Sequence, residues 1–249
     1  MNTVSHYLPG NIAVSCIQTA GARHRDKQQP CEDSTFLRST QDWLFCGIAD
    51  GQSGAPYGRE GGRACLEAVS EYIDAAGIGN ILNASFPDEL PCAITKAFRK
   101  RLLTLSEAKG APLEDFSSTL LAMAVDLKTG KYVILHLGDG CAVSIPVSGE
   151  FILVSTPDTG LSHHHTWLTT SDNAVSHLRI RFGSLKNQKR ILLLSDGAAC
   201  FCQGKNIPWR IRDFLRNGGM PQLQEHLMQS EPTDDATCIL VDCSDAAVL

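Results

Sequence analysis

Several features are missing from this 249-residue sequence, and each absence excludes a class of protein. No apolar run approaches the roughly 18 residues that a membrane-spanning helix needs. The first residues lack a basic segment followed by an apolar one, so no secretory signal peptide is expected. Basic residues are in deficit, with 22 Lys and Arg against 27 Asp and Glu, which disfavours a dedicated nucleic-acid binder. We therefore expect a cytoplasmic protein with neither a membrane nor a nucleic-acid partner.

The ten cysteines lack the spacing of zinc or redox sites. The closest pair, Cys200 and Cys202, has one residue between its members rather than the two of a CxxC motif. Cys46 and Cys238 stand inside apolar runs, where a free cysteine packs as a small hydrophobic residue. A chain of this length also has no need of a disulfide scaffold. We expect reduced, structural thiols.

Hydrophobic periodicity indicates one domain that mixes helices and strands. Apolar side chains at three- and four-residue steps predict helices over 59–76 and about 88–109, and two more are expected near 207–217 and 220–229. Segment 156–175 is predicted to be an irregular surface excursion. Short apolar runs predict strands at 12–20, Trp43–Ile48, Thr119–Asp126, Tyr132–Leu137, Ala142–Pro146, Phe151–Ser155, Ile191–Leu194 and Thr237–Val241. No repeat or long linker divides the chain, so a single domain over 1–249 is expected, with sheets packed on each other and helices outside.

Acidic residues recur where predicted strands end. Asp50, Asp139 and Asp196 each follow an apolar strand and precede a glycine, and the pair Asp234-Asp235 directly precedes the last strand. Strand ends of packed sheets meet at one edge, so these acids can converge. Converging carboxylates repel each other unless a cation lies between them, and Mg²⁺ or Mn²⁺ prefers such oxygen ligands. The alternative is that each Asp-Gly pair only ends a strand at the surface.

These acids belong to an ordered series of motifs that spans about residues 12–243. The motifs are Cys31-Glu32-Asp33, ADGQSGAPYGREGGRA at 49–64, FSSTLLAMAV at 116–125, LHLGDG at 135–140, LLLSDGA at 192–198 and DDATCILV at 234–241. In this order they resemble the type 2C (PPM) class of metal-dependent serine/threonine protein phosphatases, bacterial members in particular. The resemblance implies an α+β fold, a four-layer α-β-β-α sandwich of two antiparallel sheets, each flanked by a helix pair.

The resemblance assigns the ligands of a first metal ion. Asp50 matches the acid that bridges two ions, and the carbonyl of Gly51 matches the backbone ligand beside it. Asp196 and Asp234 match the remaining carboxylate ligands of the first ion. The implied cofactors are therefore two Mn²⁺ or Mg²⁺ ions, held mainly by carboxylates.

The resemblance also assigns the acids around the other ions. Glu32 and Asp33 match acids that support the second ion. Asp139 matches the acid that, together with Asp196, holds a third and weaker ion in bacterial members. Asp50, Asp139 and Asp196 are accordingly the expected catalytic acids.

The implied reaction is hydrolysis of phosphoserine or phosphothreonine in proteins by water that two metal ions activate. Such a reaction needs no covalent enzyme nucleophile, which fits the absence of the CxxxxxR loop of thiol-dependent phosphatases. Phosphorylated proteins, and with them a cognate serine/threonine kinase pathway, are the expected partners. We expect the chain to act as a monomer.

Three positions depart from the pattern of many relatives. Gln28 stands four residues before Glu32, where many relatives have a phosphate-binding arginine. Arg25 or Lys27 could supply that charge, or they could belong to a surface charge run. Gln52 stands where some relatives carry a proton-donating histidine, and Asp235 stands where relatives often have asparagine.

Two alternatives to a general protein phosphatase stay open. A non-catalytic relative could use the same fold as a binding or regulatory module, although it would have no need of mutually repelling acids. A phosphatase could instead be dedicated to one regulatory protein or to a small phosphoester. Among the histidines, His163-His164-His165 is expected in a solvated loop rather than a zinc site, and His136 in a strand rather than among the ligands.

Overall fold

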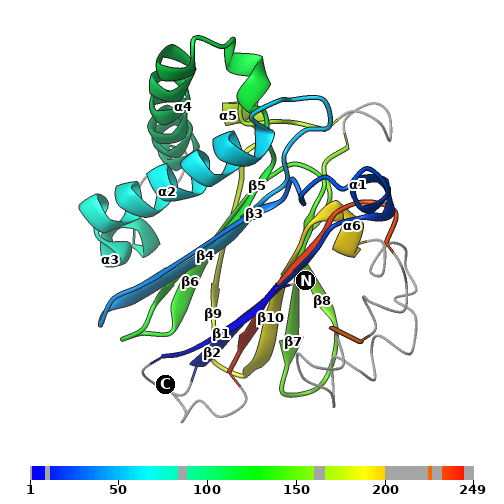
Figure 1. The fold of residues 1–249 in the computed structure, drawn as a ribbon. Helices are drawn as coiled ribbons and strands as arrows, with labels where there is room; N and C mark the ends of the chain where they lie inside the picture. The colour runs from blue at the N-terminus through cyan, green and yellow to red at the C-terminus, as the bar shows by residue number, and fades with distance from the viewer. Residues whose placement is uncertain are drawn as a thin grey trace. The chain divides into compact units, whose positions relative to one another are not determined.

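The chain divides into two compact units, each with one antiparallel sheet of its own (Figure 1). The computed structural model describes residues 2–8, 12–83, 89–159, 166–199, 224–225 and 232–243. The first unit comprises Met1–Cys31, Gly140–Thr156 and Leu185–Leu249. The second unit comprises Glu32–Asp139 and Pro157–Ser184.

The first unit contains a six-stranded sheet in the order β1-β2-β11-β10-β7-β8. All neighbouring strands are antiparallel. Two short helices, α1 and α6, lie in the connections, and apolar side chains from β2, β7, β10 and β11 form one core cluster. The bounds are β1 (Asn2–Leu8), β2 (Ile12–Thr19), α1 (Ala22–Asp26), β7 (Cys141–Pro146), β8 (Ile152–Ser155), β10 (Gln188–Leu194), α6 (Asp196–Ala199) and β11 (Ala236–Asp242).

The second unit contains a five-stranded sheet in the order β3-β4-β5-β6-β9, again antiparallel throughout. Helices α2 and α4 lie side by side along the same side of this sheet (Figure 1). The bounds are β3 (Ser34–Ser39), β4 (Trp43–Ala49), α2 (Gly58–Ala76), α3 (Ile78–Leu82), α4 (Leu90–Lys109), a 3₁₀ turn η2 (Leu113–Phe116), β5 (Leu120–Asp126), β6 (Lys131–Leu137), α5 (Ala174–His177) and β9 (Arg179–Ser184).

Glycines set the limits and the packing of the two long helices. Helix α2 ends at Gly77 and α4 at Gly110, where φ is +79° and +62°, a left-handed range that side chains disfavour. Within α2, a Cβ on Gly61 would lie 2.0 Å from the carbonyl oxygen of Phe116, so only glycine lets α2 approach η2 this closely. None of the helices in the described ranges is long and apolar enough to cross a membrane.

The elements with strong apolar periodicity are confirmed. The two long helices and all eight predicted strands are present, with bounds shifted by a few residues. Strands β1, β3 and β9 were not expected. Each is a sheet edge, and β3 and β9 are largely half-exposed, so they lack the apolar run of a buried strand. The helix expected at 207–217 lies outside the described residues, and the one at 220–229 is described only at 224–225, which are helical.

Candidate metal centre

Asp50 lies in the second unit, one residue beyond the end of the buried strand β4. Its backbone N–H donates to Oγ1 of Thr119 over 3.0 Å, and its carbonyl accepts from the Thr119 N–H over 2.8 Å. The next residue, Gly51, forms an isolated bridge with Ser118. The Asp50-Gly51 turn is therefore fixed through its backbone.

Gly51 is also the point at which three segments meet. A Cβ at this position would lie 2.9 Å from the amide nitrogen of Arg59 at the start of α2, and 3.0 Å from the carbonyl oxygen of Glu32. The absence of a side chain thus lets the Glu32-Asp33 segment pass beside Asp50. Glu32 is half-buried and Asp33 fully buried. The second unit therefore brings the early acidic motif next to the Asp-Gly turn.

Asp139 lies in the same unit, two residues beyond the end of β6. Gly138 before it has φ +121°, and a Cβ there would lie 2.7 Å from Cγ2 of Thr119. Thr119 consequently contacts both the Asp50 turn and the Asp139 turn. The Oδ2 atom of Asp139 accepts a 2.5 Å hydrogen bond from Oγ1 of Thr166, while the Gly138 carbonyl accepts one from the N–H of Asp158.

Asp196 and Asp234 lie on adjoining turns of the first unit. Two hydrogen bonds join the turns. The N–H of Ser195 donates to the carbonyl of Thr237 over 3.0 Å, and the N–H of Thr237 donates to Oγ of Ser195 over 2.9 Å. A Cβ on Gly197 would lie 2.1 Å from the carbonyl oxygen of Asp235 and 3.2 Å from that of Asp234. The glycine of the SDG motif is thus required for the close approach of the turn at Asp196 to the turn at Asp234.

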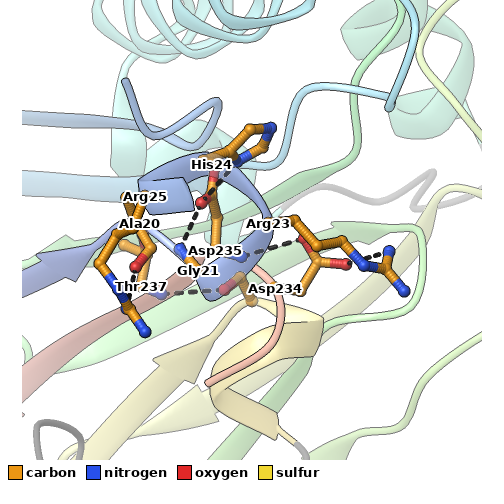
Figure 2. A network of polar contacts seen from close by, with 9 residues as sticks. Ala20, Gly21, Arg23, His24, Arg25, Asp234, Asp235 and Thr237 are labelled. Atoms are coloured by element: carbon orange, nitrogen blue, oxygen red, sulfur yellow. Dashed lines mark hydrogen bonds and ion pairs between the residues drawn. The ribbon is translucent and has the colours of Figure 1, made fainter. Parts of the chain in front are cut away.

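Helix α1 packs on the same Asp234 turn (Figure 2). The guanidinium of Arg23 lies 3.6 Å from Oδ2 of Asp234, whereas that of Arg25 donates to the carbonyl of Ala20 over 2.5 Å. Asp235 is buried, in contrast to its half-exposed neighbour Asp234. Asp235 is therefore directed into the structure rather than toward an exposed ligand position.

The predicted site residues accordingly fall into two sets. Glu32, Asp33, Asp50, Gly51 and Asp139 belong to the second unit, and Asp196 and Asp234 to the first. Over the described ranges, no three His, Cys, Asp or Glu side chains are close enough to hold a metal ion as they stand. Convergence of both sets on the same ions stays a prediction.

The chemistry of both sets suits a hard divalent cation. Every expected donor is a carboxylate or a backbone carbonyl, and no expected ligand is a thiolate or an imidazole. Oxygen-only donor sets favour Mg²⁺ and Mn²⁺, whereas zinc and copper sites in proteins typically include nitrogen or sulfur ligands.

The histidines do not add to this donor set. His136 is buried in β6 and accepts a 3.1 Å hydrogen bond from the guanidinium of Arg179. Burial, together with the charges of Arg179 and Arg181, lowers its pKa well below the usual value, so the ring stays neutral. The run His163–His165 lies outside the described residues.

Three residues that support the candidate site were missed by sequence reasoning. Thr119 lies inside the FSSTLL motif. The motif identified this segment, but it did not predict the hydrogen bonds between Thr119 and Asp50. Thr166 and His24 make their contacts with Asp139 and Asp235 across 27 and 211 residues of sequence. Only the three-dimensional structure reveals such contacts.

Comparison with known proteins agrees with this arrangement. Residues 20–242 match the family model of protein phosphatase 2C. No curated protein is similar enough in sequence to be matched to the chain.

Three solved structures share the fold at low sequence identity. Serine/threonine phosphatase Stp1 from Staphylococcus aureus is 17% identical, with a TM-score of 0.69 over 97% of this chain and 99% of that one. RsbX in complex with magnesium is 15% identical, with a TM-score of 0.62 over 97% and 99%. The catalytic domain of the phosphatase PstP in complex with two manganese ions is 16% identical, with a TM-score of 0.64 over 93% and 97%.

These findings confirm the α+β fold class and the expected phosphatase family. The matched range runs through both compact units. Because the family model covers most of the sequence, the chain belongs to the protein phosphatase 2C family.

Proposed function

We propose that this chain hydrolyses phosphoserine and phosphothreonine in proteins, using two Mn²⁺ or Mg²⁺ ions. The observation that carries the proposal is the placement of the family's acids on tightly packed turns. Asp50 and Asp139 flank Thr119 in one unit, and the turns of Asp196 and Asp234 adjoin in the other. A binding module without catalysis would have no need to order so many acids at strand ends.

The acids would share the ions as follows. Asp50 and the Gly51 carbonyl, with Asp196 and Asp234, would hold the first ion, and Asp50 would also reach the second. Glu32 and Asp33 would support the second ion. When bound, the ions supply Lewis-acid activation of water and neutralise the charge of the phosphoryl group. The part of the protein is to hold these carboxylates in place before the substrate arrives.

The phosphoryl group of the substrate also needs a cationic side chain. Arg25 and Lys27 were predicted for this role from the sequence. The guanidinium of Arg25 donates to Ala20, whereas that of Arg23 lies beside the expected ligand Asp234. Arg23 is therefore a better candidate than Arg25, since a guanidinium pairs well with phosphate oxygens.

The function is tested by assaying hydrolysis of an aryl phosphate and of phosphothreonine and phosphoserine peptides. We expect turnover with Mn²⁺ or Mg²⁺ and none in excess chelator, since no covalent nucleophile is proposed. Mn²⁺ should also raise the melting temperature, because a ligand that binds only the folded state stabilises it. Full activity in chelator would refute the metal-dependent mechanism. Activity on the aryl phosphate but on no phosphopeptide would instead favour a small phosphoester or one dedicated protein substrate.

Alkylation of accessible thiols should leave this turnover nearly unchanged. Burial raises the pKa of Cys65 and that of Cys243 to about 12, so both stay protonated and unreactive at about pH 8. Among the eight cysteines that the structure describes, Cys92 on α4 is the exposed one and should be labelled before the other seven by iodoacetamide. Peptide mass spectrometry identifies the labelled sites, and Cys92→Ser is the matched control. Activity loss that follows labelling of Cys31, next to Glu32, would point to redox control instead.

A further inference from the structure

The side chain of Asp235 is a buried carboxylate at the edge of the candidate site. It is only 2% exposed, and its Oδ1 accepts 2.8 Å hydrogen bonds from the Gly21 N–H and from Nδ1 of His24 (Figure 2). A buried carboxylate is costly unless charge and hydrogen bonds compensate it. His24 and Gly21 provide this compensation from a segment more than 200 residues away in sequence.

Helix α1 depends on these polar contacts. It has only five residues, and none of them is buried, so apolar packing contributes little to its position. Its first amides donate outward instead, Ala22 to the carbonyl of Pro232 over 2.9 Å and Arg23 to that of Thr233 over 3.4 Å. A Cβ on Gly21 would lie 2.3 Å from the carbonyl carbon of Asp234, so α1 starts in direct contact with the Asp234 turn.

The placement of α1 decides which basic side chain lies near Asp234. Arg23 is the residue whose guanidinium reaches Asp234, while its neighbour His24 is directed to Asp235. Any rotation or loosening of α1 would move both side chains together, because they are adjacent in one turn of helix.

We propose that His24 and Asp235 form a positioning pair that fastens α1 to the Asp234 turn and so holds Arg23 beside Asp234. The pair itself does not touch the substrate. The pair affects binding of the phosphoryl group only through Arg23, and this effect rests on the proposed function. The fastening of α1 does not rest on the proposed function.

Amide hydrogen exchange of the metal-free protein tests the fastening. His24→Ala should reduce the protection of the Ala22 and Arg23 amides by about tenfold or more, because local opening of α1 becomes easier. His24→Asn keeps a side-chain N–H donor near Nδ1 and should retain most of the protection. Arg190→Ala is the matched control. It breaks a partly buried ion pair with Asp242 at the opposite end of β10 and β11, so it should lower stability without affecting α1.

A double-mutant cycle with Arg23 tests the consequence for substrate binding. At saturating Mn²⁺, His24→Ala should raise KM for a phosphothreonine peptide about tenfold, with a smaller change in kcat. In the Arg23→Ala background the same substitution should change KM little, because coupled residues do not contribute additively. Equal effects of His24→Ala in both backgrounds would refute action through Arg23.

Two results separate the fastening of α1 from the proposed function. Unchanged protection of the Ala22 and Arg23 amides in His24→Ala would overturn the fastening whatever the activity. A wild-type protein with no metal-dependent turnover would refute the proposed function, yet the exchange experiment would still decide the fastening. If His24→Ala does not fold, His24→Ala/Asp235→Asn removes the uncompensated buried charge, and it should show the same loss of protection.

Discussion

Asp50→Ala is expected to abolish metal-dependent turnover while the metal-free protein stays folded. Asp50 is proposed to bridge both principal ions, so its removal should weaken both together. The loss should exceed the roughly 100-fold in metal affinity or activity that removal of an outer-shell partner typically costs.

The fold should tolerate Asp50→Ala because the backbone of Asp50 helps to hold the turn. Both backbone groups of Asp50 are hydrogen-bonded to Thr119, and alanine retains both bonds. Removal of one of the carboxylates that are proposed to converge should also reduce their mutual repulsion in the metal-free state. We therefore expect a melting temperature near that of the wild type without metal, and loss of the rise that Mn²⁺ causes.

Asp126→Ala is the matched control at the other end of the same strands. Asp126 lies opposite Trp43 at the start of β4, and its carboxylate accepts from the N–H of Lys128 and the hydroxyl of Thr129 over 2.9 and 2.8 Å. Its loss should cost about 1–3 kcal/mol of stability and leave Mn²⁺ affinity unchanged. Calorimetric Mn²⁺ titration and turnover of both variants check the contrast. Wild-type Mn²⁺ affinity in Asp50→Ala would contradict the bridging role.

Elements that are buried and periodic were predictable from the sequence, and edge elements were not. Strand β5 is buried at every residue, so its apolar run is unmistakable. Strand β9, Arg179–Ser184, has no buried residue and alternates weakly, and it becomes a strand only because β6 offers it a partner. Its pairing is a property of the sheet rather than of its own residues.

The candidate acids were predictable because the family's motifs are local in sequence. Their environment was not, because it depends on contacts between distant segments. Asp234 and Asp235 are adjacent residues of the same type, yet Asp234 is half-exposed and Asp235 is buried under α1. Likewise, Arg25 lies closer in sequence to the expected phosphate-binding position than Arg23, but the turn of α1 directs it to a backbone carbonyl. Side-chain direction in a five-residue helix follows from its docking, which the sequence does not reveal.

Asp139→Ala should lower turnover without removing the two principal ions. Asp139 is proposed to contact only the third, weaker ion, so the carboxylates of Asp50, Asp196 and Asp234 remain for the others. Turnover should fall by a factor of about 10²–10⁴ if that ion positions or polarises the reacting water. Mn²⁺ titration should still detect the two tight sites.

The alternative role of Asp139 is to hold the chain that follows it in place. Its carboxylate accepts from Thr166, and the adjacent Gly138 carbonyl accepts from Asp158 and from Arg179 over 2.9 and 3.1 Å. The carbonyl contacts do not need the Asp139 side chain, so the turn should survive the substitution at a cost of about 1 kcal/mol. Among the contacts of the described residues, only the hydrogen bond to Thr166 is lost with the carboxylate.

Thr166→Val separates the two roles, since it removes that hydrogen bond and keeps the carboxylate of Asp139. If Asp139 acts on a third ion, Thr166→Val should retain most of the turnover that Asp139→Ala loses. If Asp139 serves only to anchor Thr166, the two variants should fall alike, and the assignment to a third ion is wrong. Turnover as a function of Mn²⁺ concentration provides a second criterion. Asp139→Ala should lose a weak activating phase at high Mn²⁺, which Thr166→Val should keep, because only the former removes an oxygen ligand.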